Sequence, residues 1–408
     1  MNDHPNYKWY ILILASLTTT FVIGVPAVSL AVLFKEIIGD LHLNLVQVGL
    51  IWSIGSLPAI FTSPLSGAVI DRFGPKRVML AGVFLVALTA GLRGVATSFG
   101  TLMGIIVVVG GLVPLVINSS YKVCGIWFPP QQLGRANSIL TMGMGLGALL
   151  GALLSATVIS PWLGGWRHVM FFYGVLAALF CIPWAFTRPA PQTIEGKTRE
   201  PAAIPMRQAL THIAKLKNIW LFGITLLGIS GCIQGLSGYL SLYLKNLGWP
   251  AVQADGALSL LSATGLIFIL PIGWVSDRLR ERKKMLFVVL PLMAVGTALL
   301  SVVNGWLVWA AIILTGIVNS GATALLLALV IESDGVGPLY AGTAVGFVMF
   351  FFQLGNFLSP PLGNKLADFA PGLPFVLWAG MVVIGILSLV FANSGRKIGE
   401  VKAEPQPL

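Results

Sequence analysis

The residue in this sequence with the clearest capacity for chemistry is Lys122, a cation inside a long apolar run. It stands five residues before Trp127, which places it about 7.5 Å deeper along a helix that rises ~1.5 Å per residue. A charge kept inside a membrane is costly and usually faces a cavity or a partner. No Asp or Glu is expected at a comparable depth. These residue types predict electrostatic binding of a small anion, with contact to a gate or snorkelling towards the lipid headgroups as alternatives.

Catalytic constellations are not evident in the sequence. The four histidines are scattered near predicted helix ends or in loops, and no HExxH, GxSxG or P-loop pattern occurs. The three cysteines share no metal-ligand or disulfide spacing and are interpreted as small core residues. We therefore predict a protein that is not an enzyme, that needs no metal or cofactor, and that draws energy from a gradient rather than from ATP.

A Gly-x-x-x-Asp-Arg pattern occurs twice, at Gly67–Arg72 and at Gly273–Arg278, each time after a long apolar run. The two copies lie 206 residues apart in a chain of 408 residues, and cations follow both. Such an offset is expected of a transporter built by duplication of a six-helix unit.

The elements that must hold these residues are long apolar helices. Hydrophobic residues make up 56% of the chain, charged residues 10%, and the mean hydropathy is +0.90, values that indicate a membrane protein with several spans. Nucleic-acid binding is not predicted despite the net charge of +11, because the cations cluster at the ends of apolar runs. A membrane helix needs about 20 apolar residues. The sequence supplies twelve candidates, at roughly 9–34, 46–70, 78–98, 101–126, 136–160, 167–187, 218–244, 254–275, 285–303, 306–331, 342–362 and 372–393.

The expected organisation is an N-terminal six-helix bundle over residues 1–187, a cytoplasmic linker over 188–217, a C-terminal six-helix bundle over 218–394 and a cytoplasmic tail over 395–408. Prolines among charges mark the linker. Of the 25 Lys and Arg residues, 19 fall on the linker side of the predicted spans, and cations accumulate in cytoplasmic loops. We therefore predict a multi-pass protein of the cell inner (plasma) membrane, surrounded by the lipid bilayer, with both termini cytoplasmic.

Small residues and prolines predict how some of the helices pack. Gly143, Gly147 and Gly151 recur at intervals of four residues, a pattern typical of closely packed membrane helices. Pro26 and the run Ser359–Pro361 remove backbone donors and are expected to kink or end their helices.

The loop GAVIDRFGPKR at Gly67–Arg77 resembles the signature loop of the major facilitator superfamily, and GWVSDRLRERKK at Gly273–Lys284 resembles its weaker second copy. Trp127–Pro129, Gly134–Ala136 and Gly165–Arg167 are further landmarks similar to that family. The resemblance covers essentially the whole chain. It implies an all-α integral membrane protein with twelve transmembrane helices in two six-helix bundles.

Within that superfamily, Arg93, Asn118 and Lys122 are similar to the branch of cyanate and nitroimidazole porters. The same stretch shares features with monocarboxylate porters and with nitrate/nitrite porters. The second and eighth predicted helices lack the membrane-embedded arginine that the nitrate/nitrite group uses, so a nitrate substrate is not favoured.

The resemblance also implies where substrate binds, because the first, fourth, seventh and tenth helices of this superfamily line the central path. Each neutral side chain there has interhelical hydrogen bonding as its alternative role. The predicted substrate-binding residues are Lys122, Asn118, Tyr121, Thr19, Trp52, Gln234, Tyr239, Asn319, Gln353 and Asn356.

The signature loop and its second copy are expected to act as cytoplasmic latches, in which charges meet helix ends and acidic groups in one conformation only. The alternative is that the cations merely fix the topology. The predicted gating residues are Gly67, Asp71, Arg72, Lys76, Arg77, Arg135, Asp277, Arg278 and Glu332.

These observations predict a secondary active transporter for a small anion such as a monocarboxylate, cyanate or nitrite. It would work by alternating access, as a proton symporter or an anion exchanger. The expected partners are the small-molecule substrate and a coupling proton, and the default for this fold is a monomer. The alternatives are a drug or amphiphile exporter of the same fold and a non-transporting membrane sensor.

Overall fold

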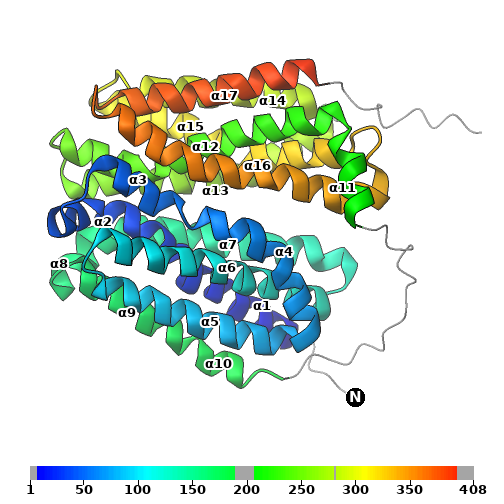
Figure 1. Ribbon diagram of the computed structural model, residues 1–408, viewed down its shortest axis with the longest axis horizontal. Coiled ribbons are helices and arrows are strands. Elements are labelled where there is room, and N and C mark those ends of the chain that lie inside the picture. Colours follow the sequence, from blue (N-terminus) through cyan, green and yellow to red (C-terminus); the bar gives the residue numbers. More distant parts are fainter. Residues whose placement is uncertain (1–6, 189–205, 280–281, 393–408) are drawn as a thin grey trace, which may run out of the picture.

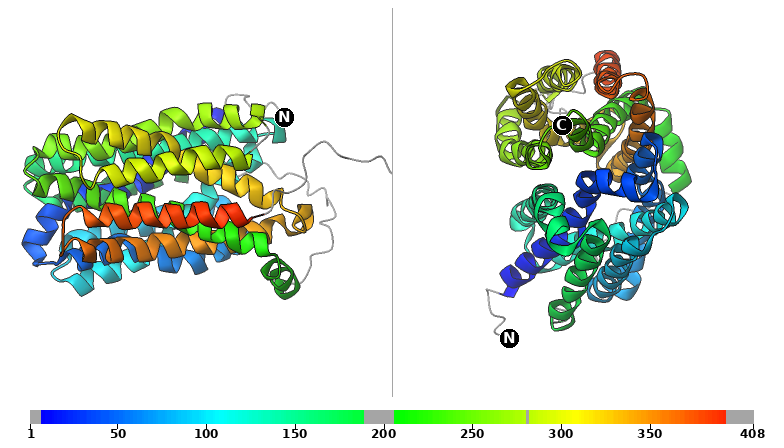
Figure 2. Two further views of the ribbon diagram at one scale, coloured as in Figure 1. Left: turned by 90° about the horizontal axis from the view of Figure 1, so that it is seen from above. Right: turned by 90° about the vertical axis from the view of Figure 1, so that its left-hand side faces the viewer.

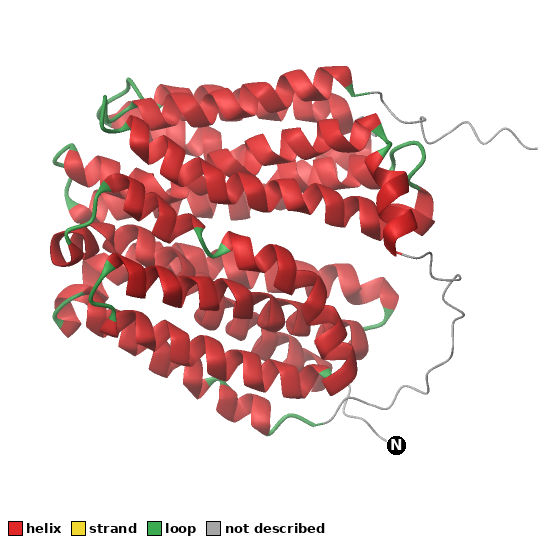
Figure 3. Cartoon of the chain, viewed as in Figure 1, coloured by secondary structure: helices red, strands yellow, loops and turns green. Residues whose placement is uncertain are grey.

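The computed structural model describes residues 7–188, 206–279 and 282–392. Inside those ranges, the side chains of residues 130, 206, 269–270, 272–279, 318–320 and 338 are outside the description. The described chain is helical throughout and shows no strand (Figure 3). We call residues 7–188 the first half and residues 206–392 the second half.

The first half contains six long segments, several of them interrupted. A π-helical turn interrupts the first segment and another lies in the fifth. The elements are α1 (Tyr7–Thr18), η1 (Thr19–Gly24), α2 (Val25–Leu41), α3 (Leu45–Ser53), α4 (Ser56–Phe73), α5 (Pro75–Leu92), η2 (Arg93–Val95), α6 (Phe99–Trp127), α7 (Pro130–Leu154), η3 (Ser155–Ile159), α8 (Ser160–Leu163), α9 (Trp166–Leu179) and α10 (Cys181–Ala185).

The second half consists of one short helix followed by six long ones. The elements are α11 (Met206–Ala214), α12 (Lys217–Asn246), α13 (Ala251–Leu279), α14 (Arg282–Leu299), α15 (Trp306–Ile331), α16 (Gly337–Leu366) and α17 (Leu373–Phe391).

Eleven helical segments of the described chain are long and apolar enough to cross a membrane. They correspond to eleven of the twelve predicted spans. The remaining predicted span corresponds to α14, which begins with three cations, Arg282, Lys283 and Lys284. With α14, the described chain has the twelve long segments expected from the sequence. The all-helical membrane fold is thus confirmed.

The helices run side by side between two ends, as Figures 1 and 2 show. At the linker end, where Gly74, Phe128 and Leu216 lie, α10 ends and α11 begins. At the distal end, His42, Ser98 and Gly248 lie in the turns between segments. In Figure 1 the linker end is at the right, and there the two halves spread apart.

The two halves contact each other mainly through α3 and α4 against α16, α7 against α13, and α2 and α3 against α12. The backbones of the two halves approach closely near the distal end, where a Cβ on Gly49 of α3 would stand 2.7 Å from the backbone nitrogen of Pro361. Asn364 of α16 donates a hydrogen bond to the carbonyl of Leu45, 2.9 Å away. The distal end is therefore closed by direct backbone contact between the halves.

Within the first half, the glycines of α7 allow the first segment to lie against it. A Cβ on Gly147 would stand 2.4 Å from the carbonyl oxygen of Thr20, and one on Gly151 would stand 2.5 Å from that of Val25. The hydroxyl of Thr20 donates to the carbonyl of Gly143 at 2.8 Å. The close packing predicted from the glycine spacing is confirmed.

Candidate functional site

Lys122 lies on α6 near the linker end, where it faces the last turn of α4. Its Nζ is 3.1 Å from Oδ1 of Asp71, and the two side chains are 52% and 65% exposed. The expectation of a buried ammonium without a carboxylate partner is therefore wrong. The last turn of α4 runs alongside this part of α6, so a residue predicted for the latch supplies the counter-charge.

One turn deeper on α6, the amide of Asn118 connects the same two helices. It donates to the hydroxyl of Ser66 at 2.6 Å and to the carbonyl of Ser63 at 3.2 Å. Tyr121 turns towards α7 instead, with its hydroxyl 3.3 Å from that of Thr141. The three predicted residues of α6 thus lie together, and each has a partner within the first half.

Thr19 is buried, and its hydroxyl is used inside the helix packing. It donates to the carbonyl of Ser16 at 2.8 Å and lies 3.3 Å from the carbonyl of Leu140. In this structure Thr19 therefore makes a hydrogen bond between helices, which was the alternative to substrate binding.

Trp52 and Gln234 join the two halves. Nε1 of Trp52 donates to the backbone carbonyl of Gln234 at 2.8 Å, and Nε2 of Gln234 donates to the carbonyl of Trp52 at 3.3 Å. The indole also lies against Gly238, where a Cβ would stand 2.4 Å from the ring. This reciprocal pair closes the space between α3 and α12.

Tyr239 is buried in an aromatic cluster with Tyr243, Phe375 and Trp378. Its hydroxyl donates to the carbonyl of Pro371 at 3.3 Å. This environment is a packed core between α12 and α17, and it separates Tyr239 from the charges near Lys122.

Two predicted residues of α16 contact each other, since the amide of Asn356 donates to Oε1 of Gln353 at 3.2 Å. Both side chains are half-buried. The side chain of Asn319 lies outside the described residues. In this conformation the predicted substrate-binding set is therefore divided among several places.

Two cations of the first predicted latch have contacts within their own half. Lys76 donates to the carbonyls of Ala185 at 2.9 Å and of Thr187, at the end of α10. The guanidinium of Arg72 lies 5.4 Å from the ring centre of Phe73. Arg77 and Arg135 are exposed.

In the second half, Nη2 of Arg282 is 3.3 Å from Oε1 of Glu332, a pairing of the kind expected for Glu332. A Cβ on Gly67 would meet no atom within 4 Å. The side chains of Asp277 and Arg278 lie outside the described residues.

Sequence reasoning missed a buried ion pair near the distal end. Nζ of Lys245 is 2.7 Å from Oδ1 of Asp255, with the two side chains 6% and 0% exposed. Both residues lie near helix ends, where charged side chains are usually solvated. Their opposite charges, one at the end of α12 and one near the start of α13, were the available signal.

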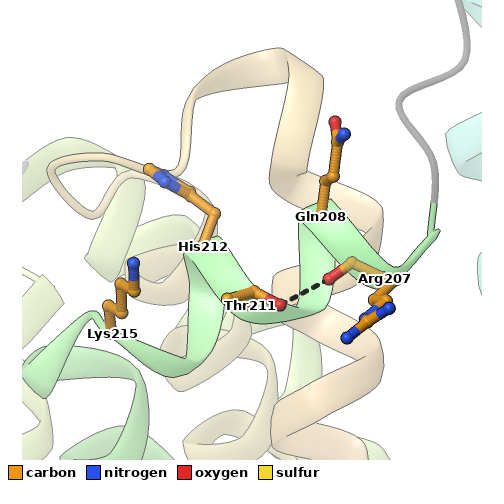
Figure 4. Close-up of a pocket in the computed structure, with 5 residues that line it drawn as sticks. All are labelled: Arg207, Gln208, Thr211, His212 and Lys215. Atoms are coloured by element: carbon orange, nitrogen blue, oxygen red, sulfur yellow. Dashed lines mark hydrogen bonds between the residues drawn. The ribbon is translucent and has the colours of Figure 1, made fainter.

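A polar groove of about 450 Å³ lies on α11, outside the sites described above. Gln208, His212 and Lys215 rise on one side of the helix in Figure 4, whereas Arg207 points to the other. The hydroxyl of Thr211 donates to the carbonyl of Arg207 at 2.7 Å. No group of three or more His, Cys, Asp or Glu side chains that could hold a metal ion occurs in the described part of the chain.

Two bundles of long apolar helices, joined by backbone contacts at one end and carrying exposed charges at the other, define a multi-pass membrane transporter. The profile of the Major Facilitator Superfamily matches residues 12–335 and 256–407. The chain belongs to that superfamily, and the relatives described next are transporters and not enzymes.

Individual relatives give the same picture. Monocarboxylate transporter 13 of Rattus norvegicus is 25% identical over 364 residues, 89% of this chain and 83% of the relative. The 3-(3-hydroxy-phenyl)propionate transporter of Escherichia coli (strain K12) is 26% identical over 376 residues, 87% of each chain. The crystal structure of a bacterial homologue of the human lysosomal transporter Spinster, inward-facing and unoccupied, superposes with a TM-score of 0.75 at 17% identity and 95% coverage of each chain.

Proposed function

We propose that this transporter is a secondary active carrier of small anions, with monocarboxylates as the preferred class. The observation that carries the proposal is the half-exposed ammonium of Lys122 beside α4. Exposed ion pairs are weak, typically below about 1 kcal/mol, so a substrate carboxylate can displace Asp71 from Lys122. The two relatives described above are similar over most of their length, and both are named for carboxylate-bearing substrates.

Transport on this proposal proceeds by alternating access of two six-helix bundles, residues 1–187 and 218–394, connected by the linker 188–217. The distal end is closed by Trp52, Gln234, Gly49 and Asn364, while Lys122 and Asp71 are exposed near the linker end. The linker end is cytoplasmic in the orientation that the cation distribution favours. The structure then corresponds to an inward-facing state in the cell inner membrane, with both termini cytoplasmic.

The neutral residues of the predicted site have two roles in this scheme. Asn118, Tyr121, Gln353 and Asn356 offer donors and acceptors to the substrate once it has entered. Trp52 and Gln234 seal the distal side of the path until the halves rearrange. The carrier acts as a monomer and moves its anion with a coupling proton or in exchange for another anion.

Replacement of Lys122 by alanine tests the proposal. We expect uptake of radiolabelled monocarboxylates into proteoliposomes to fall at least about tenfold, mainly through a higher KM, because the loss of one charge-assisted hydrogen bond is worth roughly 1.5–3 kcal/mol. Lys122→Arg should retain most of the uptake. Cyanate and nitrite belong in the same panel, together with cationic drugs.

The Asp71→Asn variant separates substrate binding from gating. If Lys122 only holds Asp71, the two variants will have the same effect; if Lys122 binds substrate, Asp71→Asn will not raise the KM. Lys8→Ala, which removes a cation bound to Gln132 at the same end, is the matched control. Unchanged uptake in Lys122→Ala, or transport of cations alone, would contradict the proposal.

A further inference from the structure

The ion pair between Lys245 and Asp255 is unusual because one of its oxygens has no partner. Oδ1 of Asp255 receives both Nζ of Lys245, at 2.7 Å, and the hydroxyl of Ser241, at 2.5 Å. Oδ2 of the same carboxylate is buried and has no hydrogen-bond partner in the described structure. A buried acceptor without a donor is costly, and it marks a position where a proton can be bound.

The pair also belongs to the contact between the halves. Nζ of Lys245 donates to the carbonyl of Val32 on α2, 2.8 Å away. One turn further along α13, the hydroxyl of Ser259 lies 3.4 Å from the carbonyl of Leu149 on α7. Separation of the halves at the distal end breaks both contacts and brings the ion pair into water.

Few other charges act on this carboxylate. On α2, Glu36 lies within Coulombic range of Asp255, but its oxygens accept from the hydroxyl of Ser160 at 2.8 and 2.7 Å, and Lys35 is exposed. The distal parts of α7, η3, α14 and α15 contain no ionisable residue besides cysteine or tyrosine. Lys245 is thus compensated chiefly by Asp255.

We infer that Asp255 is a proton-binding site that controls the distal end, so that a proton bound at Oδ2 favours the distal-open state. The carboxylate becomes a neutral acid, and the ammonium of Lys245 keeps its proton. A buried charge that has lost its counter-charge strongly destabilises the state that buries it. Hydration of Lys245 relieves this cost. Water reaches the ammonium only when the two halves separate and Lys245 leaves the carbonyl of Val32.

The direction follows from the charge states. With Asp255 ionised, the pair is neutral as a whole and the closed distal end is stable. Acidification on the distal side protonates Asp255 and opens that end. This inference depends only on the closed distal contact and not on the nature of the substrate, so it stands or falls separately from anion transport.

The test measures the distance between two spin labels at the distal end, on Cys residues introduced at Thr97 and Asn304. Both positions are exposed, and they lie in different halves; the native cysteines at 124, 181 and 232 are replaced by alanine. In lipid nanodiscs, we expect the long-distance population to rise at least about tenfold relative to the short one between neutral and mildly acidic buffer.

Two substitutions identify the group that responds. Asp255→Asn should populate the long distance at every pH, because Lys245 is then always unpaired. The double variant Lys245→Met with Asp255→Asn removes both charges, so it should return to the short distance and show no pH response. Asp40→Asn is the matched control, since Asp40 pairs with Arg167 at 2.9 Å at the same end but within one half.

Three results would overturn the inference: distances in the otherwise unaltered protein that do not change with pH, a pH response that persists in Asp255→Asn, or a double variant as open as the single one. The last would mean that lost packing, and not an unpaired charge, opens the distal end. If Asp255→Asn fails to fold, the pH titration and the double variant still decide the question.

Discussion

Replacement of Gly49 by valine is expected to abolish transport and leave the protein folded. A Cβ at this position would stand 2.7 Å from the nitrogen of Pro361 and 2.8 Å from the carbonyl carbon and oxygen of Pro360. All three atoms are backbone atoms of the opposite half, so they cannot move aside as a flexible side chain would. Overpacking of about 2 kcal/mol against the distal-closed state shifts the ratio of the two states by roughly 30-fold.

Gly39→Val provides the comparison for this change. Gly39 lies on α2 near the same end, is exposed, and would meet no atom within 4 Å of an added Cβ. The labels at Thr97 and Asn304 should report a long distance for Gly49→Val and the ordinary distance for Gly39→Val, and uptake should follow the same order. Normal transport by Gly49→Val would show that the two halves do not need this contact to close.

Replacement of Gly147 by valine is expected to destabilise the first half itself. Its Cβ would stand 2.4 Å from the carbonyl of Thr20 and 2.9 Å from Cα of Gly24, both in the segment packed against α7. Overpacking of this kind costs about 3 kcal/mol, because the first segment must move away and its hydrogen bond from Thr20 to Gly143 is lost. Thermal unfolding in detergent, followed by tryptophan fluorescence, measures the effect.

The control for Gly147 lies on the same helix. Gly134 is exposed and its Cβ would meet no atom within 4 Å, so Gly134→Val carries the same change in helix propensity without the clash. We expect its unfolding midpoint to remain close to that of the unaltered protein. Equal midpoints for both variants would exclude close packing as the reason for the glycine at position 147.

Much of the fold could be predicted from the sequence because membrane-spanning helices are recognisable as long runs of apolar residues. The glycine spacing of α7 also indicated its packing, since backbone contact requires a missing side chain. The roles of single polar residues were harder to predict. The sequence places Thr19 and Asn118 in helices that line a path in this family. It does not show that the hydroxyl of Thr19 bonds to its own helical segment and to α7, or that the amide of Asn118 bonds to α4.

The partners of the charged residues were also difficult to predict from the sequence. Lys122 and Asp71 were each singled out, yet assigned to different functions, because their pairing depends on how α4 and α6 run relative to each other. Lys245 and Asp255 lie near helix ends, where the sequence alone gives no sign of burial. In the structure, α2 of the other half contacts Lys245 and α7 contacts α13 near Asp255. Contacts between such distant segments leave little trace in a single sequence.

The contact of Lys76 with the end of α10 has a counterpart in the second half. Lys283 donates to the carbonyl of Ala392 after α17, as Lys76 does to that of Ala185, and both pairs are separated by 109 residues. The offset between these contacts, 283 minus 76, is 207 residues, one more than the offset of the Asp-Arg patterns. The spacing from aspartate to lysine is five residues in the first half, from Asp71 to Lys76, and six in the second, from Asp277 to Lys283. The same contact between a lysine and the carbonyl at a helix end is therefore present in both halves although the two loops differ in length by one residue.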